Sequence, residues 1–162
     1  MNNDYLELHC HTNYSFQEGA STVSELLNRA KEIGYKGLGL TDHDNLCAAM
    51  EFSELAKMSG LKAIIGAEVS LQGGSHITLL ASTKKGYSNL CKLISLEYFR
   101  GEKQKPELDK TQLYQYSDGL LLLSGCSKGE LAKTFLENQF DKTTKILKEY
   151  LDVFGRKNVF IE

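Results

Sequence analysis

The chain alternates short apolar runs with longer amphipathic stretches. Residues 5–11 (YLELHCH) alternate apolar and polar side chains as a strand does, and residues 37–41 (GLGLT) form a second short apolar run. Between them, residues 22–34 place apolar side chains at helical spacing, with Thr22 and Glu25 arranged as a capping box. The pattern therefore predicts a strand, a helix and a second strand at the N-terminus.

The alternation continues with one interruption. We expect a helix over about 45–59, ended by Gly60, and strands over 61–71 and 75–82. The sequence QGG at 72–74 joins these two strands and predicts a hairpin, so the second strand should run antiparallel to the first. The later elements should be a helix over about 87–99, a polar loop over 100–109, a short helix, a strand over 119–125, two helices and a final strand over 158–162.

Short apolar strands that alternate with amphipathic helices indicate an α/β fold. We expect a mostly parallel sheet with helices outside it, either a barrel or an open doubly wound sheet. The composition agrees, because 41% of the 162 residues are hydrophobic and 25% are charged, as in a folded globular domain. With no visible repeat or linker, residues 1–162 should form one unit.

Charge and hydropathy limit the expected partners. A net charge of −2 gives no overall attraction to nucleic acid or acidic membranes, so a polyanion would have to be captured locally. No apolar run approaches the ~20 residues that span a bilayer, and the N-terminus lacks the pattern of a signal peptide. We therefore expect a cytoplasmic protein without a membrane partner, whose four cysteines are mostly reduced and buried.

Candidate chemistry is concentrated in the histidines. His9 and His11 lie two apart, where strand side chains share a face. His43 follows the second strand, and His76 begins the strand after the hairpin. An isolated His-x-His is more often a solvated or hydrogen-bonded strand face than a metal site. All four histidines of the chain lie at predicted strand ends, however, and the carboxyl ends of parallel strands meet at one edge, which favours a common metal site.

Other polar residues have both a structural and a ligating interpretation. Glu68 lies inside an apolar strand and requires a compensating partner, which a bridging position between two metal ions would supply. Asp42 and Asp44 fit turn and helix N-cap positions, and we prefer this interpretation to metal ligation. Cys126, taken alone, would more often be a buried apolar residue than a ligand. Imidazole, carboxylate and thiolate together suit Zn²⁺, Mn²⁺ or Fe²⁺ better than Mg²⁺ or Ca²⁺.

In combination, these motifs resemble the polymerase and histidinol phosphatase (PHP) family. The motifs are His-x-His at the first strand, Thr-Asp-His-Asp after the second, Gly-Ala-Glu in the third, then a histidine and Gly-Cys-x-x-Gly. The stretches GYSNLCKLISLEYFRG and DGLLLLSGCSKGEL resemble in particular the PHP domain that opens the alpha subunit of bacterial DNA polymerase III, including its error-prone relatives. The resemblance implies a distorted (β/α)₇ TIM-like barrel that binds up to three divalent metal ions.

The resemblance also implies a set of ligands. The matching positions are His9, His11, Glu18, His43, Glu68, His76 and Cys126. Glu18 departs from the pattern, because this branch of the family generally has Asp there, and the longer carboxylate could shift the geometry. The remaining ligands of the family belong to an Asp-x-His motif on a later strand, which does not appear before Glu162. We therefore expect residues 1–162 to be the N-terminal portion of a PHP domain, truncated before its last strands.

The implied activity is metal-dependent phosphoester hydrolysis, since paired metal ions can stabilise both the attacking and the leaving oxygen at phosphorus. The expected sets are His9, His11 and Glu68 for one ion, Glu68, His76 and Cys126 for a second, and Glu18 with His43 for a third. Glu68, as the bridge, and His43 are the expected catalytic residues. In the polymerase context the substrate would be a DNA 3′ end and the activity a proofreading 3′ to 5′ exonuclease. The rest of the polymerase chain and other replisome subunits would be its partners.

Two other functions remain open. One is a free-standing PHP phosphatase that acts on a small phosphoester, although the polymerase-like stretch GYSNLCKLISLEYFRG argues against it. The other is a non-catalytic PHP module that braces the polymerase. Metal content would distinguish the structural module from both enzymes.

Overall fold

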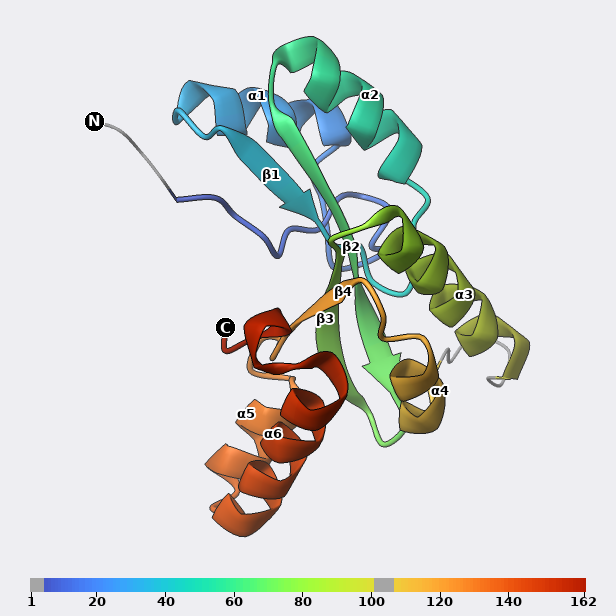
Figure 1. Cartoon of the computed structure of the whole chain (residues 1–162). Coiled ribbons are helices and arrows are strands. Elements are labelled where there is room, and N and C mark those ends of the chain that lie inside the picture. Colours follow the sequence, from blue (N-terminus) through green and yellow to red (C-terminus); the bar gives the residue numbers. More distant parts are fainter. Residues whose placement is uncertain (1–4, 101–106) are drawn as a thin grey trace.

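The computed structural model describes residues 5–100 and 107–162, which are built around one sheet (Figure 1). The strands of these ranges are, in their order across the sheet, β1 (Gly37–Leu40), β2 (Lys62–Leu71), β3 (Ser75–Ala81), β4 (Leu120–Leu123) and β5 (Val159–Phe160). β1 is parallel to β2, β3 is antiparallel to both of its neighbours, and β5 is parallel to β4. All strands except β3 therefore run in one direction, which confirms the predicted mostly parallel sheet.

Helices cover the sheet as two separate groups. They are α1 (Val23–Glu32), α2 (Ala49–Ser59), α3 (Lys84–Arg100), α4 (Lys110–Gln115), α5 (Glu130–Leu136) and α6 (Phe140–Phe154), with a 3₁₀ turn at Arg156–Asn158. α1 and α2 bury one apolar cluster with β1, and the later helices bury a larger one against β2, β3 and β4. No helix in the described part of the chain has the length and apolar character needed to cross a membrane.

Local sequence signals set most of the element ends. The predicted capping box at α1 is confirmed, because the Thr22 side chain accepts from Glu25 N and the Glu25 carboxylate accepts from Thr22 N. α2 ends at Gly60, which has a left-handed φ of 73°. It begins at Ala49 rather than near Asn45, because the Asn45 side chain accepts from Cys47 N and closes a turn there. Most of the predicted loop over 100–109 lies outside the described residues.

The predicted hairpin between β2 and β3 is confirmed. Gly73 and Gly74 adopt φ of 92° and 74°, and the strands pair antiparallel from Leu71 opposite Ser75 onward. This reversal carries His76 back to the edge where β2 ends. The last strand is shorter than predicted, because only Val159 and Phe160 pair with β4.

The strand predicted over 5–11 is wrong. This segment is extended beside β1, and its carbonyls accept from β1, with Gly39 N bonded to Glu7 O (2.7 Å) and Thr41 N bonded to Cys10 O (2.9 Å). Its own amides are bonded to side chains instead. Leu8 N and His9 N donate to Glu7 Oε1, and Cys10 N donates to Thr41 Oγ1. Two paired strands each need to donate amide hydrogen bonds to the other, so residues 5–11 form no strand beside β1.

The expectation that most cysteines are buried is also wrong. All four lie in the described ranges and are unpaired, but Cys47 and Cys126 are exposed and Cys10 and Cys91 are only half-buried. Cys47 lies in the turn before α2 and Cys126 in the loop after β4, where no packed layer covers them.

Replacing Gly39 with Ala should lower both stability and the order of the His9 segment. The added Cβ would lie 2.6 Å from Leu8 O and 2.7 Å from Leu8 Cα, so the backbone beside β1 must move. We expect a loss of about 1–3 kcal/mol in the free energy of unfolding, measured by chemical denaturation. Gly34→Asn is the control, because nothing lies within 4 Å of a Cβ there and Asn tolerates its left-handed φ. Equal stability of Gly39→Ala and wild type would contradict the close approach.

Candidate metal centre

Glu68 is a buried carboxylate in the middle of the sheet and only 3% exposed. Its neighbours in β2, Ala67 and Val69, face the apolar core, so the alternation of the strand turns Glu68 to the opposite side. Its backbone forms a parallel bridge with His43, through Asp44 N bonded to Glu68 O and Glu68 N bonded to Asp42 O. The strand therefore fixes Glu68 next to the loop that follows β1.

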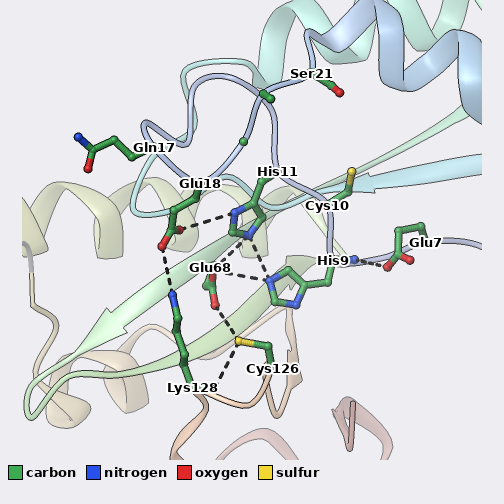
Figure 2. A pocket seen from close by; sticks show the side chains of 12 residues that line it. Glu7, His9, Cys10, His11, Gln17, Glu18, Ser21, Glu68, Cys126 and Lys128 are labelled. Atoms are coloured by element: carbon green, nitrogen blue, oxygen red, sulfur yellow. Dashed lines mark hydrogen bonds and ion pairs between the residues drawn. The ribbon is translucent and has the colours of Figure 1, made fainter.

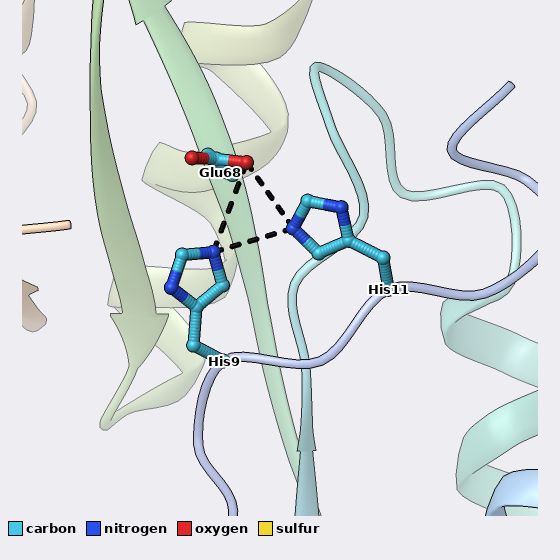
Figure 3. A group of neighbouring side chains, drawn as sticks. All are labelled: His9, His11 and Glu68. Atoms are coloured by element: carbon cyan, nitrogen blue, oxygen red, sulfur yellow. Dashed lines mark hydrogen bonds and ion pairs between the residues drawn. The ribbon is translucent and has the colours of Figure 1, made fainter. Parts of the chain in front are cut away.

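His9 and His11 turn their rings toward Glu68 from the extended N-terminal segment (Figure 3). Glu68 Oε2 lies 3.1 Å from His11 Nε2 and 3.7 Å from His9 Nε2, and the two imidazole nitrogens are 3.2 Å apart. One ligand atom from each of these residues lies within 4.8 Å of the others, so the group could hold one metal ion.

His76 and Cys126 approach the other oxygen of the same carboxylate. His76 Nδ1 is 3.3 Å from Glu68 Oε1, and Cys126 Sγ is 3.9 Å from it. The geometry at His76 Nδ1 is nevertheless not that of a hydrogen bond, and this buried nitrogen has no hydrogen-bond partner among the described residues. A cation between His76 and Glu68 would satisfy both atoms, so the residues present fit a metal ion.

His43 and Glu18 complete the predicted set. His43 Nδ1 lies 2.6 Å from Glu18 Oε2, and His43 Nε2 lies 3.2 Å from Asp44 Oδ2. The hydrogen bond with Asp44 raises the pKa of His43 to about 9 against the effect of burial, with Glu18 adding to the rise. The His43 and His76 rings are 4.5 Å apart, and these histidines with Glu68 form a second group that could hold an ion.

The structure thus brings all seven predicted residues to one place. Five of them line a cavity of about 860 Å³ (Figure 2), and His43 and His76 contact members of that lining. The grouping differs from the sets expected above, because the second group consists of His43, Glu68 and His76. Cys126, whose Sγ is 3.9 Å from Glu68 Oε1, belongs to neither group.

The charges of the site depend on one another. Burial alone would raise the pKa of Glu68, but its contacts with His11, His76 and His9 outweigh this effect and hold the pKa well below its usual range. Burial disfavours the charged form of His9, yet Glu162 and Glu68 raise its pKa to about 10. Carboxylate and imidazolium groups therefore stabilise each other, and a metal ion would take over the role of the protons on the imidazoles.

Asp42 and Asp44 have structural roles, although not as caps of α2, whose N-cap is Ala48. Asp42 is buried and accepts hydrogen bonds from Thr12 N, Thr12 Oγ1 and Ser15 Oγ, each 2.7 Å long. Asp44 accepts from Ser70 N (2.7 Å) and Ser70 Oγ (2.9 Å). The first aspartate holds the loop that leads to Glu18, and the second ties the His43 loop to β2.

Two further carboxylates contribute to the site and were not predicted. Glu162 Oε1 lies 2.7 Å from His9 Nδ1, an arrangement that directs the other ring nitrogen of His9 toward Glu68. Its position just after β5, at a strand end like the other candidates, is the signal that could have indicated it.

Glu97 of α3 is the second of these, and it is fully buried. Burial, followed by the nearby carboxylate of Asp44, raises its pKa to about 10, so Glu97 carries a proton at neutral pH. Its spacing from Leu90 and Leu93 places it on the buried face of α3, and that spacing could have revealed an unusual buried acid.

Comparisons with known proteins agree on the family. The family model of the PHP domain matches residues 7–162. The chain is 35% identical to the DNA polymerase III subunit alpha of Aquifex aeolicus, over 96% of this chain and 15% of that protein. It is 36% identical to the error-prone DNA polymerase of Cutibacterium acnes, over 98% of this chain and 15% of that protein. The chain therefore spans about one seventh of the length of these curated relatives.

A solved structure shares the fold. A two-domain protein from Bacteroides vulgatus, described as containing a predicted PHP-like metal-dependent phosphoesterase, aligns with a TM-score of 0.52 at 13% identity. The alignment covers 77% of this chain and 36% of that one. The expected α/β class of the PHP type is thereby confirmed.

Glu68→Ala should remove most bound metal, because the carboxylate lies between both candidate groups and its loss leaves imidazoles facing one another. We expect the metal content, measured by elemental analysis after dialysis, to fall severalfold. Glu51→Ala, an exposed change on α2, serves as the control and should leave it unchanged. An unaltered metal content in Glu68→Ala would make Glu68 a structural carboxylate only.

Glu97→Gln should stabilise the protein increasingly as pH rises. The pKa of Glu97 is about 10 in the folded chain and near 4.5 in the unfolded chain, so unfolding releases its proton between these values and stability falls with rising pH. The side-chain amide in Glu97→Gln does not ionise, so the variant does not lose stability in this way as pH rises. We expect a gain of about 1–3 kcal/mol near neutral pH and none at about pH 4, measured by denaturation.

The control for Glu97→Gln is Glu54→Gln, an exposed change on α2. Its effect on stability should be small at every pH. A Glu97→Gln variant whose stability follows wild type across the whole pH range would show that Glu97 is ionised in the folded chain.

Proposed function

The chain belongs to the PHP domain family, and we propose that it is the metal-dependent phosphoesterase module of a bacterial DNA polymerase III alpha subunit. The observation that carries this proposal is the Glu68 carboxylate, buried and approached by His9, His11 and His76 within 3.7 Å. Such a buried charge with imidazoles on both of its oxygens suits two divalent ions better than it suits an apolar core.

The proposed ligands are the seven residues expected from the sequence. His9, His11 and Glu68 would hold one ion, and Glu68 with His76 and either Cys126 or His43 would hold a second. The side chains of Glu18 and His43 are in contact and could contribute to the binding of a third ion. Zn²⁺, Mn²⁺ or Fe²⁺ bound there would supply Lewis-acid charge for the oxygens of a phosphoester.

The chain's own residues would prepare the site for this chemistry. Glu162 holds His9 in one ring orientation, and Asp44 and Glu18 do the same for His43. We assign the catalytic roles to Glu68, as the carboxylate common to both groups, and to His43, as the imidazole beside the cavity. Hydrogen bonds that fix ligand orientation in advance spare the site from reorganising when substrate binds.

The proposed substrate is the 3′ end of a DNA strand, and the proposed activity is 3′ to 5′ exonucleolytic removal of a mispaired nucleotide. This proposal is supported by the similarity of the chain to polymerase subunits. The chain matches a small part of each of them. On this proposal the rest of the polymerase chain and other replisome subunits are the partners, in the cytoplasm. Residues 1–162 would then be the N-terminal portion of the PHP domain.

The direct test is digestion of a primer with a 3′ mismatch, with Mn²⁺ or Zn²⁺ supplied. We expect slow, metal-dependent release of the terminal nucleotide by this chain and faster release by a chain extended through the expected Asp-x-His motif. His43→Ala should reduce either rate by at least about tenfold, because an imidazole near the reacting group is lost. Chelation by EDTA is the control.

Three results would contradict parts of the proposal. If both chain lengths released the terminal nucleotide at the same rate, the expectation of further ligands in the Asp-x-His motif would be wrong. Hydrolysis of small phosphomonoesters without any action on the primer would favour a free-standing phosphatase, and bound metal without any hydrolysis would favour a structural module.

A further inference from the structure

The cavity beside the candidate ligands contains a lysine that the metal centre does not use. Lys128, in the loop after β4, extends toward Glu18, with its Nζ 3.3 Å from Glu18 Oε1 (Figure 2). Among the described residues that line this cavity it is the one lysine, and none is an arginine; the acidic residues of the lining are Glu7, Glu18 and Glu68. An anionic substrate in the cavity would therefore be within reach of this ammonium group.

The backbone of Lys128 is fixed by two of the candidate ligand residues. His76 N donates to Lys128 O (3.4 Å), and Lys128 N donates to Cys126 Sγ (3.5 Å). The turn around it is tight, because a Cβ on Gly129 would lie 2.4 Å from Ser124 O. The Cα of Lys128 therefore keeps a constant position relative to Glu68 and its histidines.

The side chain of Lys128, by contrast, lies largely in solvent. It is 60% exposed, and an ion pair between exposed side chains contributes little to stability. Its partner Glu18 also contacts His43, at 2.6 Å, so that carboxylate keeps a partner when the ammonium group leaves. Lys128 could therefore leave Glu18 and bind an incoming phosphate at a small cost in free energy.

We propose that Lys128 binds the phosphate group of the substrate and positions it against the metal centre. The inference rests on the proposed phosphoesterase function. An ammonium group donates hydrogen bonds to the non-bridging oxygens of phosphate and acts as a point charge that needs no fixed orientation. Because Lys128 is not a candidate ligand and its partner Glu18 is, removal of Lys128 lowers the affinity for phosphate and does not lower the affinity for metal.

The test compares Lys128→Met, Lys128→Arg and Lys142→Met with wild type, each as the full chain loaded with Mn²⁺. Lys142 is an exposed lysine of α6 outside the cavity and is the matched control. Binding of inorganic phosphate is measured by titration calorimetry, and bound metal by elemental analysis. For Lys128→Met we expect phosphate affinity to fall about tenfold, at unchanged metal content. Lys128→Arg should retain most of the affinity and Lys142→Met all of it.

The outcomes separate this inference from the proposed function. Unchanged phosphate affinity in Lys128→Met, no phosphate binding by wild type, or loss of metal in Lys128→Met would each overturn the role of Lys128. If the wild-type chain binds phosphate through Lys128 but cleaves no phosphoester, the proposed function fails and the phosphate site stands. If it cleaves a phosphoester with the same KM in Lys128→Met, the function stands and the inference fails.

Discussion

The negative charge of Glu68, buried in the middle of a strand, is the constraint on which the rest of the site depends. An unpaired carboxylate in such a position would destabilise the fold by several kcal/mol, so the chain has to bring positive groups to it. Three histidines reach it from separate segments, His9 and His11 from the extended N-terminus and His76 from β3. The site therefore assembles only when these segments fold against β2.

Other buried carboxylates hold the loops that make this possible. Asp42 binds the loop of Thr12 and Ser15, and Asp44 binds Ser70 of β2. Both accept hydrogen bonds from backbone or hydroxyl groups, and Asp44 also lies 3.2 Å from His43 Nε2. The consequence is a frame of carboxylates around a group of imidazoles, which on the proposed function would orient the candidate ligands before any ion binds.

Much of this could be predicted from the sequence because the determining signals are local. The capping box of α1, Gly60 after α2 and the QGG hairpin each act within a few residues, and the parallel strands between the helices follow from periodicity. His43, His76 and Cys126 were predictable because each lies near the end of a strand, and Glu68 because a carboxylate inside an apolar strand needs a partner. Glu18 was expected only from the resemblance to the PHP family. The failures arise from distant contacts. Residues 5–11 have the pattern of a strand, but Glu7 and Thr41 take the amide hydrogens that a ladder needs. Likewise, Glu97 and Glu162 acquire their roles only when α3 and β5 pack against loops far away in the sequence.

We propose that Glu68 and its histidines hold divalent metal ions. Anomalous X-ray diffraction from crystals grown with Zn²⁺, recorded on both sides of the zinc absorption edge, tests it most directly. We expect an anomalous peak about 2.0–2.3 Å from a Glu68 oxygen and from nitrogens of His9 and His11, with a second peak near His76. Anomalous peaks found only at surface histidines or cysteines, with none beside Glu68, would contradict it.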